Sequence, residues 1–167
     1  MIYVIRDRES NHESNCLSQY GIDRCNDIVN TFSYMERLSI YTCLPKRNFI
    51  QNDDFPHYST TIQYIKPLQT ASNVCSKLDK HLKFIQTKDD FPPIRDGTNY
   101  LIIWHRDVTQ IINQYFYNTN FIWKDDEYDG CLILDKYNWE FIPTFIQKNK
   151  LKEFCKMIFE WLTQKFD

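Results

Sequence analysis

The sequence predicts a three-layer α/β protein, with a mainly parallel sheet covered by helices on both faces. Short apolar runs of strand length alternate with stretches whose apolar residues recur at helical spacing. The run 1–5 is continuously apolar, and so is 99–104 after Asn99, which is typical of strands buried on both faces. With 167 residues, 43% of them hydrophobic, the chain is long enough for one domain, 1–167, with its own core.

The expected elements follow from these patterns in chain order. Strands are predicted over 1–5, 39–43, 99–104, 131–135 and 139–145, the last two as a pair joined by a turn. Helices are predicted over 21–35, 67–82, 107–116 and 148–167. Ser18 is suited to cap the first helix, and Pro67 to the first turn of the second.

Two segments carry alternatives of their own. The stretch from Pro45 to Tyr64 shows no clear period, and we expect a loop insertion over 47–64. The helix over 148–167 has an apolar stripe that either packs on the core or forms a surface for a protein partner.

The charge balance excludes several classes of partner. A net charge of −2 provides no polybasic surface, so we expect neither nucleic acid nor membrane as the main partner. The apolar start is too short for a signal peptide, and no stretch approaches the roughly 18 apolar residues of a membrane span. We therefore expect a soluble, cytoplasmic protein. Its few glycines and many Asn, Ile, Lys, Tyr and Phe residues are typical of an AT-rich genome, such as that of a large DNA virus, and the location would then be host cytoplasm or virion.

The cysteines and acidic runs give little support for a metal or cofactor. The cysteines are scattered on predicted apolar faces without a CxxC pair, and we interpret them as reduced core thiols: Cys16, Cys25, Cys43, Cys75, Cys131 and Cys155. Asp53-Asp54 and Asp125-Asp126-Glu127 are interpreted as solvated turns. We expect no metal site and no cofactor.

Cationic side chains follow two of the predicted strands. Arg6-Asp7-Arg8 comes directly after the first strand, and His105-Arg106-Asp107 follows the strand 99–104. Ligands of parallel sheets bind outside the carboxyl ends of the strands, so both groups are expected at the same edge. Because guanidinium groups bind phosphate oxygens in bidentate fashion, this edge is predicted to form an anion pocket, most simply for phosphate.

Several segments together resemble the histidine phosphatase (phosphoglycerate mutase-like) superfamily. In that family a strand ends in Arg-His-Gly-Glu, and Leu-Ser/Thr-x-x-Gly-x-x-Arg begins the first helix. IYVIRDRES is similar to the first segment, and the second is matched in order by Leu17, Ser18, Gly21 and Arg24. Further similar segments follow in family order: IYTCLP, KPLQTA, NYLIIWHRDVTQII and WKDDEYDGCLILD. Their order over most of the first 135 residues implies the histidine-phosphatase fold.

The resemblance implies a role for each residue after the first strand. In the family the first histidine attacks phosphorus, while arginines and a second histidine hold the phosphoryl oxygens and an acid protonates the leaving group. Arg6 falls on the first arginine, Asp7 on the nucleophile and Arg8 on the glycine. Glu9 falls on the acidic residue after that glycine.

The remaining family positions fall later in the chain. Lys66 takes the place of the second arginine, and Thr70 matches the threonine of Arg-x-x-x-Thr-Ala. His105 falls on the second histidine, unless Trp104 is aligned with a family branch that has Trp before this histidine, in which case Arg106 takes its place. Asp7 and His105 are thus the candidate catalytic positions.

Three departures from the family pattern predict that its chemistry is lost. A carboxylate at Asp7 repels a phosphate dianion by roughly 4 kcal/mol per pair of unit charges 4 Å apart at an effective dielectric constant near 20, whereas a neutral imidazole does not. Arg8 adds bulk where a substrate approaches the backbone, and Lys66 keeps a charge without the bidentate grip of arginine. His12, His57 or His81 is the alternative nucleophile, although loop or surface positions explain all three.

The sequence thus favours a catalytically impaired pseudophosphatase that keeps at most a phosphate or anion pocket made by Arg6, Arg8, Lys66 and Arg106. Its ligand would be inorganic phosphate or a phosphorylated small molecule. The other readings of Arg6-Asp7-Arg8 are a closed ion cluster without ligand, and an active phosphomonoesterase or phosphotransferase that uses Asp7 or a displaced histidine. An interaction or virion-associated protein is a further alternative. For His105, a structural role and a ligand contact both stay open.

Overall fold

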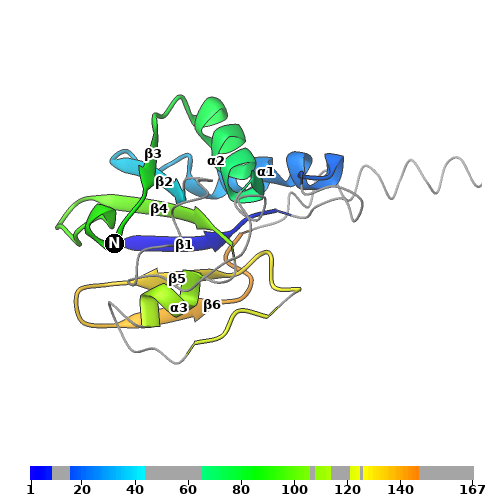
Figure 1. The fold of residues 1–167 in the computed structure, drawn as a ribbon. Coiled ribbons are helices and arrows are strands. Elements are labelled where there is room, and N and C mark those ends of the chain that lie inside the picture. The colour runs from blue at the N-terminus through cyan, green and yellow to red at the C-terminus, as the bar shows by residue number, and fades with distance from the viewer. Residues whose placement is uncertain (9–15, 44–64, 106–107, 114–120, 125, 147–167) are drawn as a thin grey trace, which may run out of the picture.

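A computed structural model describes residues 1–8, 16–43, 65–105, 108–113, 121–124 and 126–146, and all structural statements below concern these residues. The predicted insertion over 47–64 and the predicted helix over 148–167 lie outside them. Six strands form one sheet in the spatial order β3-β2-β4-β1-β5-β6. The α/β class predicted from the sequence is confirmed in this coarse form (Figure 1).

The sheet is mixed, with parallel pairing among four of its strands and antiparallel pairing on the side of β5 and β6. β1 (Ile2–Arg6) and β4 (Asn99–Trp104) pair in parallel, as do β4 with β2 (Leu38–Cys43) and β2 with β3 (Leu82–Ile85). β5 (Cys131–Leu134) instead runs antiparallel to β1 and to β6 (Trp139–Ile142). The amino end of β5 therefore lies beside the carboxyl ends of β1 and β4.

The first helix, α1 (Gln19–Phe32), begins where its cap was predicted. Ser18 has extended backbone angles, and its side-chain oxygen accepts a hydrogen bond from the backbone N–H of Gly21 at 2.9 Å. This satisfies one of the amide groups that have no partner within the first helical turn. The apolar face of α1 packs Cys25, Ile28 and Phe32 against the sheet.

The second helix is shorter than predicted. α2 spans Ile65–Leu78, with Pro67 in its first turn, so the prediction of a helix over 67–82 was wrong at its carboxyl end. Asp79 adopts a left-handed conformation with φ 53°, and the amide of Lys80 donates to Cys75 O at 3.0 Å. Both features are typical of a helix end. The chain then turns into β3, where Leu82 pairs with Ile40. The apolar spacing of Leu82 fits either element, because a short apolar run does not distinguish helix from strand.

The two faces of the sheet carry separate hydrophobic clusters. α1 and α2 pack over one face, where Ile5, Ile40 and Ile103 are fully buried. The other face buries Trp104 together with Trp123 and the short helix α3 (Val108–Ile112), which represents the predicted helix over 107–116 in the described part of the chain (Figure 1). Alternate strand residues point to opposite faces, which explains why the continuous apolar runs of β1 and β4 supply both clusters.

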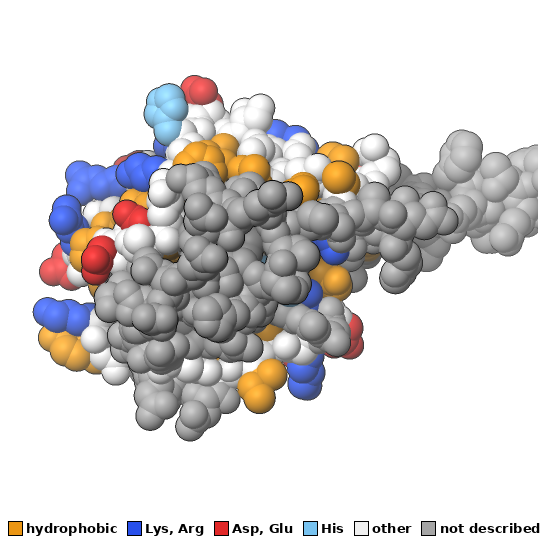
Figure 2. Space-filling model, in the orientation of Figure 1, with side chains coloured by type: hydrophobic (Ala, Val, Ile, Leu, Met, Phe, Trp, Pro, Cys, Tyr) orange, Lys and Arg blue, Asp and Glu red, His pale blue; other side chains and the backbone are white. Residues whose placement is uncertain are grey.

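Three further properties of the described residues concern surface charge, helix composition and the cysteines. On the face drawn in Figure 2, Lys and Arg side chains occur together with Asp and Glu side chains rather than as a field of one sign. In the described ranges, no helix combines the length and the apolar composition that a membrane crossing requires. The prediction of core thiols is confirmed for the buried side chains of Cys25, Cys43, Cys75 and Cys131. It was wrong for Cys16, which is exposed.

Candidate functional site: the strand-end cluster

The predicted site residues after β1 lie inside the protein rather than on its surface. The exposed fractions of Arg6, Asp7 and Arg8 are 4%, 3% and 1%. The backbone N–H of Asp7 donates to Trp104 O at 2.7 Å, so the β1–β4 pairing continues past the end of β1. Together with Arg24, Asp27 and Asp129, these three residues form what we call the strand-end cluster.

The backbone of Arg8 forms a hydrogen bond with a side chain of α2. Its N–H donates to the hydroxyl oxygen of Thr70 at 3.1 Å, and both residues are buried. Thr70 lies in the first half of α2, and Lys66 lies one turn before it on the same side of the helix. Lys66 is half-buried, and the described residues show no hydrogen bond or ion pair that it makes. The structure therefore brings Thr70 to the cluster.

The carboxylate of Asp129 joins two of the arginines. Its Oδ1 lies 3.4 Å from Nη1 of Arg8, and the same oxygen contacts Nη2 of Arg24. Nη1 of Arg8 also donates to the carbonyl oxygen of Tyr128. The segment before β5 thus supplies the carboxylate that pairs with both Arg8, which follows β1, and Arg24 on α1.

Arg24 is held additionally from within its own helix. Its Nε lies 3.5 Å from a carboxylate oxygen of Asp27, one helical turn further on. Its Nη1 donates to the Tyr20 hydroxyl at 3.3 Å, and its guanidinium lies 5.6 Å from the centre of the Tyr20 ring. Contacts from both sides therefore fix the position of this charged group.

Arg6 also receives its partners from the segment before β5. Its Nη1 donates to Lys124 O at 2.8 Å. Its guanidinium carbon lies 4.4 Å from the centre of the Tyr128 ring, a distance typical of a cation–π interaction. All three arginines of the cluster thus contact residues of this one segment.

The formal charges at this edge are balanced among the described residues. The three guanidiniums of Arg6, Arg8 and Arg24 are accompanied by the carboxylates of Asp7, Asp27 and Asp129, and all but Asp129 are nearly buried. Burial of a charge costs several kcal/mol per ion unless a partner and hydrogen bonds compensate for it. The arrangement therefore has the composition of a closed ion cluster, which was one of the alternatives left open by the sequence.

Of the predicted histidine positions, the structure describes His105 and His81. His105 follows Trp104 and is half-buried, and its carbonyl oxygen accepts the N–H of Val108 at 3.1 Å where α3 begins. His81 is exposed, as the sequence predicted. The remaining candidates of the sequence interpretation lie outside the described residues: Glu9, His12, His57 and Arg106.

Sequence reasoning missed Asp129. Of the predicted solvated turn, Asp125 lies outside the described residues, Asp126 is exposed as predicted, and Glu127 is half-buried. The carbonyl oxygen of Glu127 accepts the indole N–H of Trp123 at 2.6 Å. The useful signal was the position of Asp129 directly before a predicted strand. A strand that runs antiparallel to β1 brings the residues before it next to the residues after β1, as the pairing of Ile5 with Cys131 shows.

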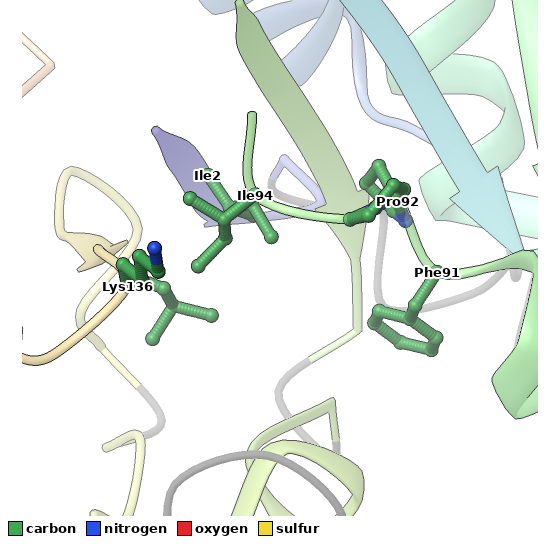
Figure 3. A pocket seen from close by; sticks show the side chains of 7 residues that line it. Ile2, Phe91, Pro92, Ile94 and Lys136 are labelled. Carbon is green, nitrogen blue, oxygen red and sulfur yellow. The ribbon is translucent and has the colours of Figure 1, made fainter. Parts of the chain in front are cut away.

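Other features of the described residues lie away from this site. No group of three His, Cys, Asp or Glu side chains among them could hold a metal ion. An apolar pocket of about 340 Å³ lies at the amino end of β1, between Ile2 and Leu134 on the sheet and Phe91 and Ile94 on the preceding loop, with Lys136 at its side (Figure 3). This pocket lies at the amino end of β1, whereas the strand-end cluster lies at the carboxyl end, so the pocket is not part of the cluster.

Neither a scan against models of protein families nor a search of curated proteins gave a match to the chain. The fold and the site together describe an α/β protein whose strand ends carry a buried, charge-balanced cluster of arginines and carboxylates.

Proposed function

We propose that the chain is a catalytically impaired protein of histidine-phosphatase-like, three-layer fold, a pseudophosphatase whose strand-end arginines retain at most a site for phosphate. The observation that carries this proposal is the position of Asp7. Asp7 follows β1, and its backbone N–H donates a hydrogen bond to the carbonyl oxygen of Trp104 at the end of β4. Its side chain is buried, and an arginine lies on each side of it in sequence. The family resemblance puts the nucleophilic histidine at this position.

Support for the family resemblance comes from the segments that meet at the cluster. Arg8 belongs to the first resembling segment, Arg24 to the second and Thr70 to the KPLQTA segment. Asp129 belongs to the WKDDEYDGCLILD segment. Arg8 contacts Thr70 and Asp129, and Asp129 in turn contacts Arg24, so these contacts link the four segments. Segments separated by up to 121 residues therefore converge as the common site of one family would require.

The loss of catalysis follows from electrostatics. A phosphate dianion brought to about 4 Å from the Asp7 carboxylate is repelled by roughly 4 kcal/mol per pair of unit charges at an effective dielectric constant near 20. Enzymes that phosphorylate aspartate offset this repulsion with a metal ion. Arg8 does not compensate for it freely, because its guanidinium already contacts Asp129.

A phosphatase that uses Asp7 or a displaced histidine is the alternative, and hydrolysis of a general aryl phosphate separates the two. We expect no turnover above the uncatalysed rate and no covalent phosphoenzyme. Turnover that is lost in Asp7→Ala would overturn the proposal. A trapped phosphoenzyme would identify its nucleophile, since phosphohistidine is labile to acid and an acyl phosphate reacts with hydroxylamine.

A protein partner bound through 148–167, as in an interaction or virion-associated protein, stays a prediction. Size-exclusion chromatography of the chain with and without 148–167 tests it. A helix that serves only a partner is dispensable for folding, whereas a core helix is not.

A further inference from the structure

We propose that Arg8 and Arg24 form an oxyanion site that Asp129 fills from within the chain, and that a small tetrahedral oxyanion such as phosphate binds there when the Asp129 carboxylate is removed. This inference deepens the proposed function and rests on its interpretation of the strand-end arginines as an anion pocket. The site differs from the one that the family resemblance implies, because it uses Arg8 and Arg24 rather than Arg6 and Lys66.

The geometry around Oδ1 of Asp129 is that of a bound anion. One Nη atom from each arginine approaches this single oxygen, at 3.4 Å for Arg8 and in direct contact for Arg24. The two guanidiniums come from different elements, Arg8 from the extension of β1 and Arg24 from the second turn of α1. Two cations that converge in this way repel each other unless an anion lies between them.

Both arginines are positioned by contacts that do not involve Asp129. The backbone of Arg8 is bonded to Thr70, and Arg24 contacts Asp27 and Tyr20 on its own helix. The site is therefore preorganised, and preorganisation lowers the cost of binding. A free anion that takes the place of the Asp129 carboxylate would therefore bind two guanidiniums that are already in position.

Burial determines from which side an anion can enter. The side chains of Arg8 and Arg24 are 0% and 8% exposed, whereas that of Asp129 is 22% exposed. Asp129 is thus the solvent-facing member of the three, and its removal opens the arginines toward solvent. Its own backbone stays anchored, because its carbonyl oxygen accepts the N–H of Ile146 at 2.9 Å.

Because the Asp129 carboxylate is attached to the same chain as the two arginines, the unmodified protein would bind free phosphate weakly. A ligand attached to the same chain competes with an effective concentration of about a millimolar or more for short connections. Free phosphate must exceed this concentration to displace the carboxylate.

Titration calorimetry with inorganic phosphate at constant ionic strength, set with chloride, tests the inference. Asp129→Asn removes the charge that draws this side chain to the two arginines, so that an anion can displace it, and we expect it to bind phosphate at least about tenfold more tightly than the unmodified chain. Asp27→Asn is the matched control, because it removes the other carboxylate beside Arg24. Asp129→Glu keeps the charge. Neither control is expected to gain affinity.

Equal affinity in Asp129→Asn and the unmodified chain, or an equal gain in Asp27→Asn, would overturn the inference. If Asp129→Asn does not fold in chloride, its thermal unfolding is measured in phosphate instead. A cooperative unfolding transition in phosphate supports the site, and the lack of a folded state in both salts overturns it. Aryl phosphate turnover would refute the pseudophosphatase and leave a measured gain in phosphate affinity standing. Lack of that gain without turnover would refute the oxyanion site alone.

Discussion

The hydroxyl oxygen of Thr70 accepts the backbone N–H of Arg8 at 3.1 Å, joining α2 to the end of β1 across 62 residues of sequence. Because both residues are buried, no solvent molecule replaces this bond when it is lost. The position of the strand-end cluster therefore depends on the first half of α2 as well as on the sheet.

Thr70→Val should destabilise the protein by about 1–3 kcal/mol, since it leaves the buried N–H of Arg8 without its acceptor. Urea denaturation followed by circular dichroism measures the free energy of unfolding. Thr70→Ser keeps the hydroxyl and should retain most of the stability. A loss in Thr70→Ser as large as that in Thr70→Val would show that packing of the methyl group, and not the hydrogen bond, matters here.

The ion pair of Arg24 and Asp129 should show strong energetic coupling. A double-mutant cycle with Arg24→Ala and Asp129→Ala is expected to give a coupling energy between about 1 and 3 kcal/mol, because the arginine side chain is only 8% exposed. Lys124 and Glu127 are the control pair: they lie 3.8 Å apart, and the lysine is 76% exposed. Their coupling should be below about 1 kcal/mol. Equal coupling in the two pairs would contradict the picture of a buried cluster.

The buried thiols should make the protein sensitive to alkali. Burial raises the pKa of Cys75 from 9.0 to about 11, so the folded protein holds this proton more tightly than the unfolded chain. The resulting contribution to stability is complete below pH 9 and is lost as the pH rises toward 11. Denaturation between pH 8 and 11 should therefore show a smaller decline in Cys75→Ala than in the unmodified chain. Cys16→Ala, at an exposed position, should leave the decline unchanged.

Gly130 should not tolerate a side chain. A Cβ atom added there would overlap the ring of Phe141, and this ring is confined by Phe121 and Trp123, whose ring centres lie 4.5 Å and 5.4 Å from its own. We expect Gly130→Ala to lower the melting temperature and to cost about 1–3 kcal/mol, as is usual for overpacking of a core.

The matched test introduces Gly130→Ala into Phe141→Leu, where the smaller side chain leaves room for the new methyl group. The substitution should cost clearly less in that background. An equal cost in both backgrounds would show that the contact with Phe141 is not the cause of the loss.

Local patterns were sufficient to predict most of the secondary structure. The cap at Ser18, the strand 99–104 and the hairpin of β5 and β6 were all expected, because each depends on residues close in sequence. The carboxyl end of α2 was misplaced. There the left-handed turn at Asp79 and the pairing of β3 with β2 ended the helix, whereas the periodicity alone would have continued it.

By itself, the sequence determined that cationic groups follow the first strand and the strand 99–104, and that an acid stands between two of them, because apolar runs specify where strands end. Only the tertiary structure decided which carboxylate accompanies which arginine. Asp129 reaches Arg24 across 105 residues because β5 adds antiparallel to β1 and brings its amino end to the carboxyl end of that strand. Strand order and the antiparallel addition of β5 depend on long-range pairing between backbones, which the apolar pattern of a single strand does not specify.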